Sequence, residues 1–273
     1  MMTPRVAAIH DMSGFGRCSL TVAIPILSAM GVQCCPLPTA FLSTHTGGFE
    51  GFTFLDMTDE MSKVADHWAS LGLTFQAVYS GFLGSERQIG VVENFICRFR
   101  GPDTVVVVDP VMVATSGARL ISEEAVEVLC RELFPLAAVL TPNIHEAEVL
   151  SGRTITGERD MEEAARAIGE RYGCAVLCKG GHRVADADDC LWQPSGVRWF
   201  RGERIDNPNT HGTGCTLSSA IAANLAKGLS LAEAVAGAKV YLSGALRAML
   251  DLGQGSGPLN HAFAIAGTYP AHI

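Results

Sequence analysis

Basic residues and long apolar runs are scarce in this chain of 273 residues. Charged residues make up 18% of the sequence, and 20 Lys and Arg stand against 28 Asp and Glu, for a formal net charge of −8. This balance argues against a broad surface for nucleic acid or for an anionic membrane. No run approaches the roughly 18 apolar residues of a membrane-spanning helix, and residues 1–10 lack the hydrophobic stretch of a signal peptide.

Several diagnostic motifs are also missing. The nine cysteines have an odd count, no C-x-x-C spacing and mostly apolar neighbours, which is typical of reduced thiols in the cytoplasm and not of a disulfide framework or zinc site. The absence of GxxxxGK[ST] excludes a P-loop. Gly14 and Gly16 begin a dinucleotide fingerprint, but Ser19 takes the place of its third glycine and no acid follows near the end of the next strand. We therefore do not expect NAD.

Short apolar runs alternate with amphipathic stretches along the whole sequence. The runs expected to be strands are residues 6–10, 33–38, 77–80, 104–108, 138–141 and 175–178, followed by a hairpin over 190–200. This alternation predicts a three-layer α/β/α fold with a doubly wound, mostly parallel sheet, and nothing between residues 1 and 273 marks a domain boundary.

Helix ends are marked by local signals. Ser122 precedes two acidic residues and is expected to be an N-cap. The pairs Asp160/Glu163 and Ser230/Glu233 have the spacing of capping boxes. Gly228 is expected to close a helix that begins near Thr213.

One segment combines glycines with a helix start, His211-Gly212-Thr213-Gly214-Cys215-Thr216. Glycines around a threonine leave backbone N–H groups free to face a ligand, and the helix that follows adds the positive end of its dipole. We expect an anion hole here, with Cys215 in the first helical turn, where a thiolate is favoured. The alternative is a glycine-rich turn beside a buried cysteine.

Polar residues also follow three of the expected strands. Asp109 ends the most apolar of them, Asn143 and Glu146 follow Thr141-Pro142, and Lys179 precedes two glycines. The carboxyl ends of parallel strands form the ligand crevice of α/β proteins, and carboxylate and amide oxygens suit Mg²⁺ held through water. Helix capping is the alternative for Asn143 and Glu146.

Taken together, these segments resemble the vitamin-kinase branch of the ribokinase superfamily. The motifs around Asp109, Asn143, Lys179 and Cys215 are similar to those of hydroxymethylpyrimidine and phosphomethylpyrimidine kinases. Residues 42–47 and 79–85 instead resemble the substrate side of pyridoxal and pyridoxamine kinases. The pyrimidine kinases usually carry glutamine where Thr44 stands, and typical pyridoxal kinases carry aspartate in place of Cys215.

The resemblance implies a ribokinase-like kinase that uses ATP with Mg²⁺ and leaves open a need for a monovalent cation. It also implies a small heteroaromatic alcohol as acceptor and a homodimer. It assigns catalysis to Cys215 as base and to the anion hole Gly212, Thr213 and Gly214. It further assigns ATP binding to Lys179, Asn143, Thr213 and Gly214, metal binding to Asp109 and Glu146, and acceptor binding to Asp11, Ser13, Thr46 and Phe82.

We expect the acceptor to be a B6 vitamer, pyridoxal, pyridoxamine or pyridoxine, because the substrate-side segments carry most information about it. The alternative is a hydroxymethylpyrimidine/phosphomethylpyrimidine kinase of thiamine biosynthesis, or an enzyme that accepts both rings. With pyridoxal, Cys215 could also add to the aldehyde as a hemithioacetal. Two other classes stay open: a cysteine hydrolase built from Cys215 with His211 or His182, and a non-catalytic binding protein.

Overall fold

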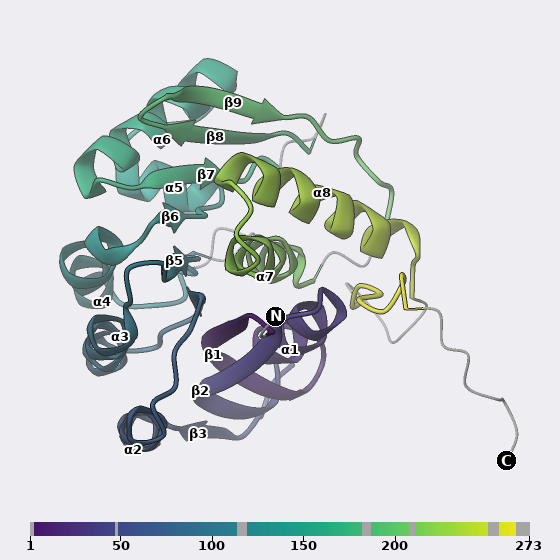
Figure 1. Ribbon diagram of the computed structural model, residues 1–273. Coiled ribbons are helices and arrows are strands. Elements are labelled where there is room, and N and C mark those ends of the chain that lie inside the picture. Colours follow the sequence, from purple (N-terminus) through teal and green to yellow (C-terminus); the bar gives the residue numbers. More distant parts are fainter. Residues whose placement is uncertain are drawn as a thin grey trace, which may run out of the picture.

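The computed structural model describes residues 3–46, 49–113, 119–181, 187–207, 211–250 and 257–265. Its centre is one nine-stranded sheet in the order β3-β2-β1-β4-β5-β6-β7-β8-β9 (Figure 1). The strands are β1 (Arg5–Phe15), β2 (Gln33–Thr44), β3 (Phe54–Asp56), β4 (Ala77–Ser80), β5 (Val105–Val108), β6 (Val139–Leu140), β7 (Ala175–Cys178), β8 (Asp189–Gln193) and β9 (Gly196–Phe200). The six from β2 to β7 in that order pair in parallel, and β3, β8 and β9 join antiparallel at the edges.

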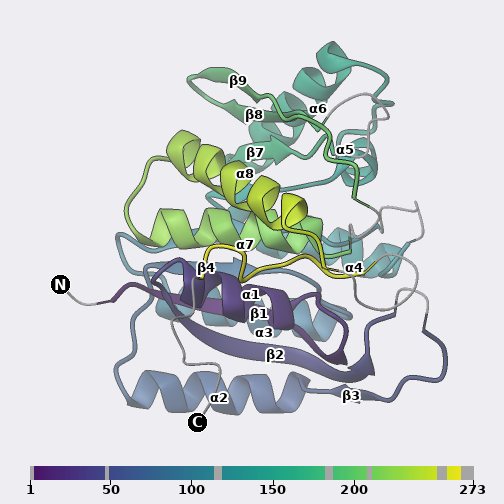
Figure 2. The same ribbon diagram turned by 90° about the vertical axis from the view of Figure 1, so that its right-hand side faces the viewer.

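Helices cover both faces of the sheet (Figures 1 and 2). One face carries α2 (Thr58–Ser70), α3 (Glu86–Phe99), α4 (Glu123–Val128), α5 (Ile144–Ser151) and α6 (Glu158–Tyr172), and the other carries α1 (Leu20–Ala29), α7 (Thr213–Ala226) and α8 (Leu231–Arg247). A π-helical turn (Leu129–Leu133) and a 3₁₀ turn (Phe134–Leu136) extend α4. Each face has its own buried apolar cluster, so the strands are apolar on both sides, as a parallel sheet between two helical layers requires.

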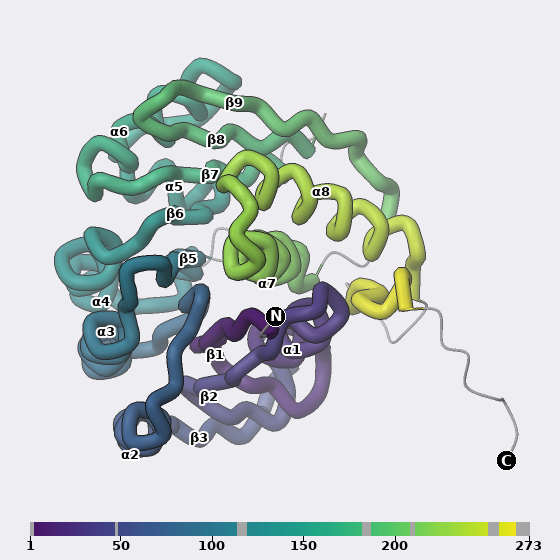
Figure 3. Tube along the Cα trace, in the orientation of Figure 1, coloured from purple at the N-terminus to yellow at the C-terminus, as the bar shows by residue number. Residues whose placement is uncertain are grey.

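The first and last parts of the chain meet on the second face. Helix α7 packs between α1 and α8 and lies against β1, β4 and β5 (Figure 3). It is apolar almost all round, with eleven residues from Thr216 to Ala226 buried, because it is covered by the sheet below and by neighbouring helices on both sides. This packing delivers the amino end of α7 to the carboxyl ends of the central strands.

The structure confirms the expected α/β/α architecture and each expected strand, with differences at the ends. Strand β1 continues to Phe15 and β2 to Thr44, although we expected them to end at residues 10 and 38. The extensions pair with each other, Ser13 with Leu42 and Phe15 with Thr44. Strand β3 was not expected; its three residues are all exposed and carry no burial pattern.

The structure confirms the expected helix ends, with one exception. Ser122 caps α4, Ser230 and Glu233 form the capping box of α8, and Gly228 follows α7 with a φ of 85°. The expected capping box from Asp160 to Glu163 is wrong. Helix α6 begins earlier, at Glu158, so Asp160 is its third residue and accepts hydrogen bonds from the backbone N–H groups of Thr156 and Gly157. Among the described residues, no helix is long and apolar enough to cross a membrane.

Candidate active site

The polar segments singled out in the sequence meet at one edge of the sheet. His10 and Asp11 lie in β1, while Asp109, Asn143 and Lys179 follow β5, β6 and β7, at the carboxyl ends of parallel strands. The first turn of α7 reaches the same edge from the other direction. The carboxyl ends of parallel strands are where α/β proteins bind ligands.

The amino end of α7 is built to face an anion. Gly212 is its N-cap with a φ of 83°, a conformation that favours glycine, and a Cβ there would lie 2.9 Å from the carbonyl oxygen of Arg17. No side chain caps the helix, so its first backbone N–H groups are left for a ligand. A Cβ on Gly214 would lie 3.4 Å from Lys179 Nζ, which places an ammonium group beside this turn.

Lys179 is buried and paired. Its Nζ donates to Asp109 Oδ1 at 2.8 Å, and the Ser218 hydroxyl donates to Asp109 Oδ2 at 3.0 Å. Burial acts to lower the pKa of Lys179, but the charges of Asp109 and Glu146 outweigh it and raise that pKa, so the group is an ammonium ion. The structure thus joins the segments after β5 and β7 through one ion pair, with α7 supplying the hydroxyl.

Asn143 and Glu146 form the capping box of α5. The Asn143 side chain accepts from the Glu146 backbone at 2.9 Å, and Glu146 Oε2 accepts from the Asn143 backbone at 2.8 Å. Glu146 Oε1 accepts from the backbone N–H of Met112 at 2.9 Å. Val111, just before it, has a φ of 45°, a strained value for a β-branched residue that turns the chain toward this carboxylate. The capping alternative is therefore realised, and a binding role for these two residues stays a prediction.

The carboxylates near Lys179 fit a metal that arrives with a ligand. Burial raises the pKa of Glu146 to about 7, helped by Asp109 and opposed by Lys179. Both Glu146 oxygens are occupied by backbone N–H groups, and both Asp109 oxygens already have partners. Within the described ranges, no group of three His, Cys, Asp or Glu side chains is placed to hold a metal ion. The donor set therefore suits Mg²⁺ bound through water and phosphate oxygens and not a cage of protein ligands.

Cys215, the expected base, has a partner that sequence reasoning missed. Its Sγ lies 3.7 Å from His10 Nε2, and His10 Nδ1 lies 2.7 Å from Asp11 Oδ1. Asp11 Oδ1 also accepts from the Ser19 hydroxyl at 2.6 Å, and Ser13 donates to the other oxygen at 3.4 Å. Burial acts to raise the pKa of Asp11, but the hydrogen bonds from His10 and Ser19 and the charge of His10 lower it overall.

A signal for His10 was present in the sequence. Alternation along β1 places His10 on the same face as Val6 and Ala8, the face that α1 and α7 cover. A histidine on that apolar side, directly before an aspartate, needs a polar partner.

The expected acceptor residues are only partly brought together. Asp11 and Ser13 belong to the group around Cys215, whereas Thr46 is exposed in the loop after β2. The ring of Phe82 is half-buried and packs on the core beneath α2 and α3, while its backbone N–H faces His10 at 3.3 Å. Thr44, at the end of β2, has a buried hydroxyl with no hydrogen-bond partner among the described residues.

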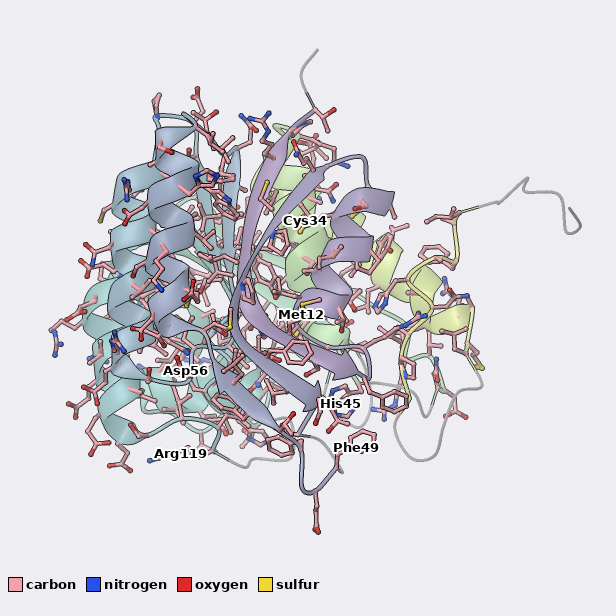
Figure 4. All side chains as sticks on the ribbon, turned by 90° about the horizontal axis from the view of Figure 1, so that it is seen from below. Met12, Cys34, His45, Phe49, Asp56 and Arg119 are labelled. Atoms are coloured by element: carbon pink, nitrogen blue, oxygen red, sulfur yellow. The ribbon has the colours of Figure 1, made fainter. Side chains whose placement is uncertain are left out.

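Of the two histidines considered for a hydrolase, His211 is paired with another aromatic ring. The ring of His211 stacks on His45 with centroids 4.1 Å apart, and Phe49 packs edge-on against His45 (Figure 4). His182 lies outside the described residues. The imidazole that lies beside the Cys215 sulfur in the described part of the chain is that of His10.

Comparison with known proteins identifies the family. Residues 24–260 match the family described as phosphomethylpyrimidine kinase. A hydroxymethylpyrimidine/phosphomethylpyrimidine kinase of Rhizobium meliloti is 38% identical over 264 residues, which cover 95% of this chain and 97% of that protein. The thiamine biosynthesis bifunctional protein ThiED of Geobacter sulfurreducens is 40% identical over 260 residues, which cover 95% of this chain and 52% of that protein, so the chain spans about half of it.

Solved structures point to the same family and to a neighbouring one. A protein of Bacteroides thetaiotaomicron, designated a phosphomethylpyrimidine kinase and crystallised in a form with pyridoxal, has a TM-score of 0.82 and 33% identity, covering 96% of this chain and 93% of that one. An ADP complex of Bacillus subtilis pyridoxal kinase has a TM-score of 0.86 and 28% identity, and the match covers 96% of this chain and 99% of that one. The relatives in sequence thus favour the pyrimidine alternative over the expected B6 vitamer. This chain is an ATP-dependent phosphotransferase with a ribokinase-like fold, and it belongs to the phosphomethylpyrimidine kinase family.

Proposed function

We propose that this enzyme transfers the γ-phosphoryl group of ATP to the hydroxymethyl group of a pyrimidine, as a hydroxymethylpyrimidine/phosphomethylpyrimidine kinase in thiamine biosynthesis. The observation that carries the proposal is the full-length similarity to kinases of that name, at 38% identity over 95% of the chain. The uncapped amino end of α7 beside Lys179 supports it, because phosphoryl transfer depends on neutralised charge and alignment. Residues 1–273 then act as one kinase domain.

The proposed roles follow from the geometry at the strand ends. The backbone N–H groups of Gly212, Thr213 and Gly214 hold the oxygens of the transferring phosphoryl group. Lys179 and Asn143 bind the nucleotide phosphates from β7 and α5. Asp109 and Glu146 would hold Mg²⁺ through water, and the ion would neutralise phosphate charge when bound with ATP.

The acceptor lies on the other side of α7. Asp11 and Ser13 line its pocket from β1, Thr46 does so from the loop after β2, and Phe82 contributes its backbone after β4. Cys215, between the two halves, takes the proton of the acceptor hydroxyl as the oxygen attacks the γ-phosphorus.

A B6 vitamer is the second candidate acceptor. It is favoured by the neighbour at 33% identity that was crystallised with pyridoxal and by Thr44, which stands where pyrimidine kinases usually have glutamine. To decide between the acceptors, ADP release from Mg·ATP is measured with hydroxymethylpyrimidine, pyridoxal, pyridoxamine and pyridoxine separately at matched concentrations. The proposal requires the highest kcat/KM with the pyrimidine, and a clear preference for any B6 vitamer overturns it.

Replacement of Thr44 by glutamine should shift acceptor preference toward the pyrimidine. The buried Thr44 hydroxyl has no partner in the described structure and can bond a ring substituent, whereas a glutamine amide can both donate to and accept from a pyrimidine edge. We expect the ratio of kcat/KM for the pyrimidine to that for pyridoxal to rise about 10-fold, or about 1.4 kcal/mol. Thr53→Gln, in the facing exposed segment, is the control, and an unchanged ratio in Thr44→Gln would remove Thr44 from the acceptor site.

We also propose that the enzyme is a homodimer joined near β3. This edge strand exposes Phe54 and Leu55, and Phe41 is exposed beside them on β2; Figure 4 shows that edge from below near Asp56. An exposed apolar edge is unusual in a stable monomer. Light scattering should give twice the chain mass, and Leu55→Glu should give a monomer. A monomeric wild type contradicts the proposal.

A further inference from the structure

His10 is a buried titratable residue in contact with the proposed catalytic thiol, and the proposed roles give it no task. It is 1% exposed, and alternation along β1 turns it toward α7 with Val6 and Ala8. A polar ring in such an apolar layer costs free energy unless its nitrogens are satisfied. Both nitrogens have partners, and one of these is the proposed catalytic thiol.

The backbone around His10 is shaped to its ring. A Cβ on Gly81 would lie 1.9 Å from His10 Cδ2, so the ring fits here because residue 81 is glycine. The Phe82 N–H faces the ring, 3.3 Å from each nitrogen, and the Tyr79 ring packs edge-on with centroids 6.3 Å apart. These contacts come from Tyr79 on β4 and from Gly81 and Phe82, which directly follow that strand.

The ring connects Cys215 to Asp11. Sγ of Cys215 lies 3.7 Å from Nε2, and Oδ1 of Asp11 lies 2.7 Å from Nδ1. The backbone N–H of Asp11 is also 3.0 Å from Nδ1, but the carboxylate is closer and charged, so Nδ1 is the donor. Asp11 is itself fixed by Ser19, which has a φ of 54° and donates its hydroxyl to Oδ1 at 2.6 Å.

The charges around His10 favour its imidazolium form. The titratable groups that face it are Asp11 on its own strand, Cys215 on α7 and the edge of Tyr79 on β4. Burial acts to lower the pKa of His10, but the hydrogen bond and charge of Asp11, with those of Cys215, raise it to about 10. An imidazolium beside a thiol stabilises the thiolate, which is the form that accepts a proton.

We propose that His10, held by Asp11, is a positioning residue of phosphoryl transfer: it orients the Cys215 sulfur toward the acceptor hydroxyl, and as an imidazolium it favours the thiolate form of that sulfur. The inference rests on the proposed role of Cys215 as base. It makes the base a three-residue unit in which the carboxylate and the imidazole come from β1 and the thiolate from the first turn of α7.

The proton balance of the step is simple. The acceptor oxygen forms its bond to the γ-phosphorus as its O–H bond breaks, and the proton passes to Cys215 Sγ. The bond from that phosphorus to the bridging oxygen breaks, and its electron pair leaves with ADP. His10 remains an imidazolium paired with Asp11, and the thiol loses its proton to solvent after product release.

The test is the pH dependence of Cys215 alkylation in His10→Asn, which keeps a polar side chain but cannot carry the charge. Iodoacetamide rates are measured between pH 6 and 9 on the peptide that contains Cys215, by mass spectrometry. At pH 6.5 the wild type should react at least about 10-fold faster than the variant, because the imidazolium beside the sulfur favours the nucleophilic thiolate form, and the two rates should converge toward pH 9.

The kinetics should change in parallel. In His10→Asn, kcat should fall at least 10-fold at pH 6.5 and recover as pH rises, while KM for ATP stays within about twofold. His67→Asn, on the exposed side of α2, is the matched control and should leave both profiles unchanged. If His10→Asn does not fold, Asp11→Asn keeps the ring and removes the charge that holds it, and its alkylation profile should shift in the same direction.

The outcomes separate the inference from the proposed function. An alkylation profile of His10→Asn that overlays the wild type overturns the role of His10, whatever the activity. A shifted profile together with a Cys215→Ala enzyme of full kcat would support the thiolate pair and refute the base. Gly81→Ala, which places a methyl group where the ring lies, should reproduce the His10→Asn profile.

Discussion

Cys215→Ala should lower kcat by about 100-fold or more, because the acceptor hydroxyl then loses the group placed to take its proton. The sulfur lies in the first turn of α7, beside the backbone N–H groups that we assign to the phosphoryl oxygens. KM for ATP should change little, since the anion hole and Lys179 are untouched. Steady-state kinetics with the preferred acceptor at saturating Mg·ATP give both values.

Two variants make this result specific. Cys97→Ala, in an exposed part of α3, should leave kcat unchanged and excludes a general effect of thiol removal. The kcat of Cys215→Asp should be at least 10-fold higher than that of Cys215→Ala, because a carboxylate is ionised at neutral pH without help from His10. A Cys215→Ala enzyme that keeps kcat within about threefold of the wild type would remove Cys215 from the chemistry and leave positioning and charge as the basis of catalysis.

The fold could be predicted from the sequence because its determinants are local. Strand β5 is a run of valines covered on both faces, and the helix ends at Ser122, Ser230 and Gly228 satisfy their own backbone groups within three or four residues. The extension of β1 to Phe15 depends instead on a distant part of the chain. Its glycine, serine and aspartate have low strand propensity, and the segment is a strand because it pairs with β2.

The site was predictable to the same extent. Residues that follow parallel strands must gather at one edge, so the proximity of Asp109 to Lys179 follows from topology. The partnership of His10 with Cys215 does not, because it joins positions 205 residues apart and depends on how α7 packs on the sheet. Asp11 was expected to face the acceptor, and its hydrogen bond to His10 could be inferred only with the face of His10 known.

Lys179→Met should have the second large effect, on both stability and activity. It leaves the Asp109 carboxylate, 3% exposed, with the hydrogen bond from the Ser218 hydroxyl but without its ion pair. Removing one member of a buried ion pair costs about 3–5 kcal/mol, which for a chain of this size lowers Tm by roughly 10 °C. The loss of the ammonium beside Gly214 should also lower kcat/KM for ATP by at least about 100-fold. Thermal unfolding and steady-state kinetics measure the two effects.

The double variant Lys179→Met with Asp109→Asn separates these effects. It removes the uncompensated charge, so most of the lost Tm should return, while kcat/KM for ATP should stay low because the ammonium group beside Gly214 is missing. Lys239→Met, which breaks a different buried ion pair, at 2.7 Å to Asp189, is the control for destabilisation. It should lower Tm to a similar degree with a much smaller loss of kcat/KM. If the double variant instead regains ATP turnover, Lys179 serves to neutralise Asp109, and the phosphates are held by the amino end of α7 and by Mg²⁺.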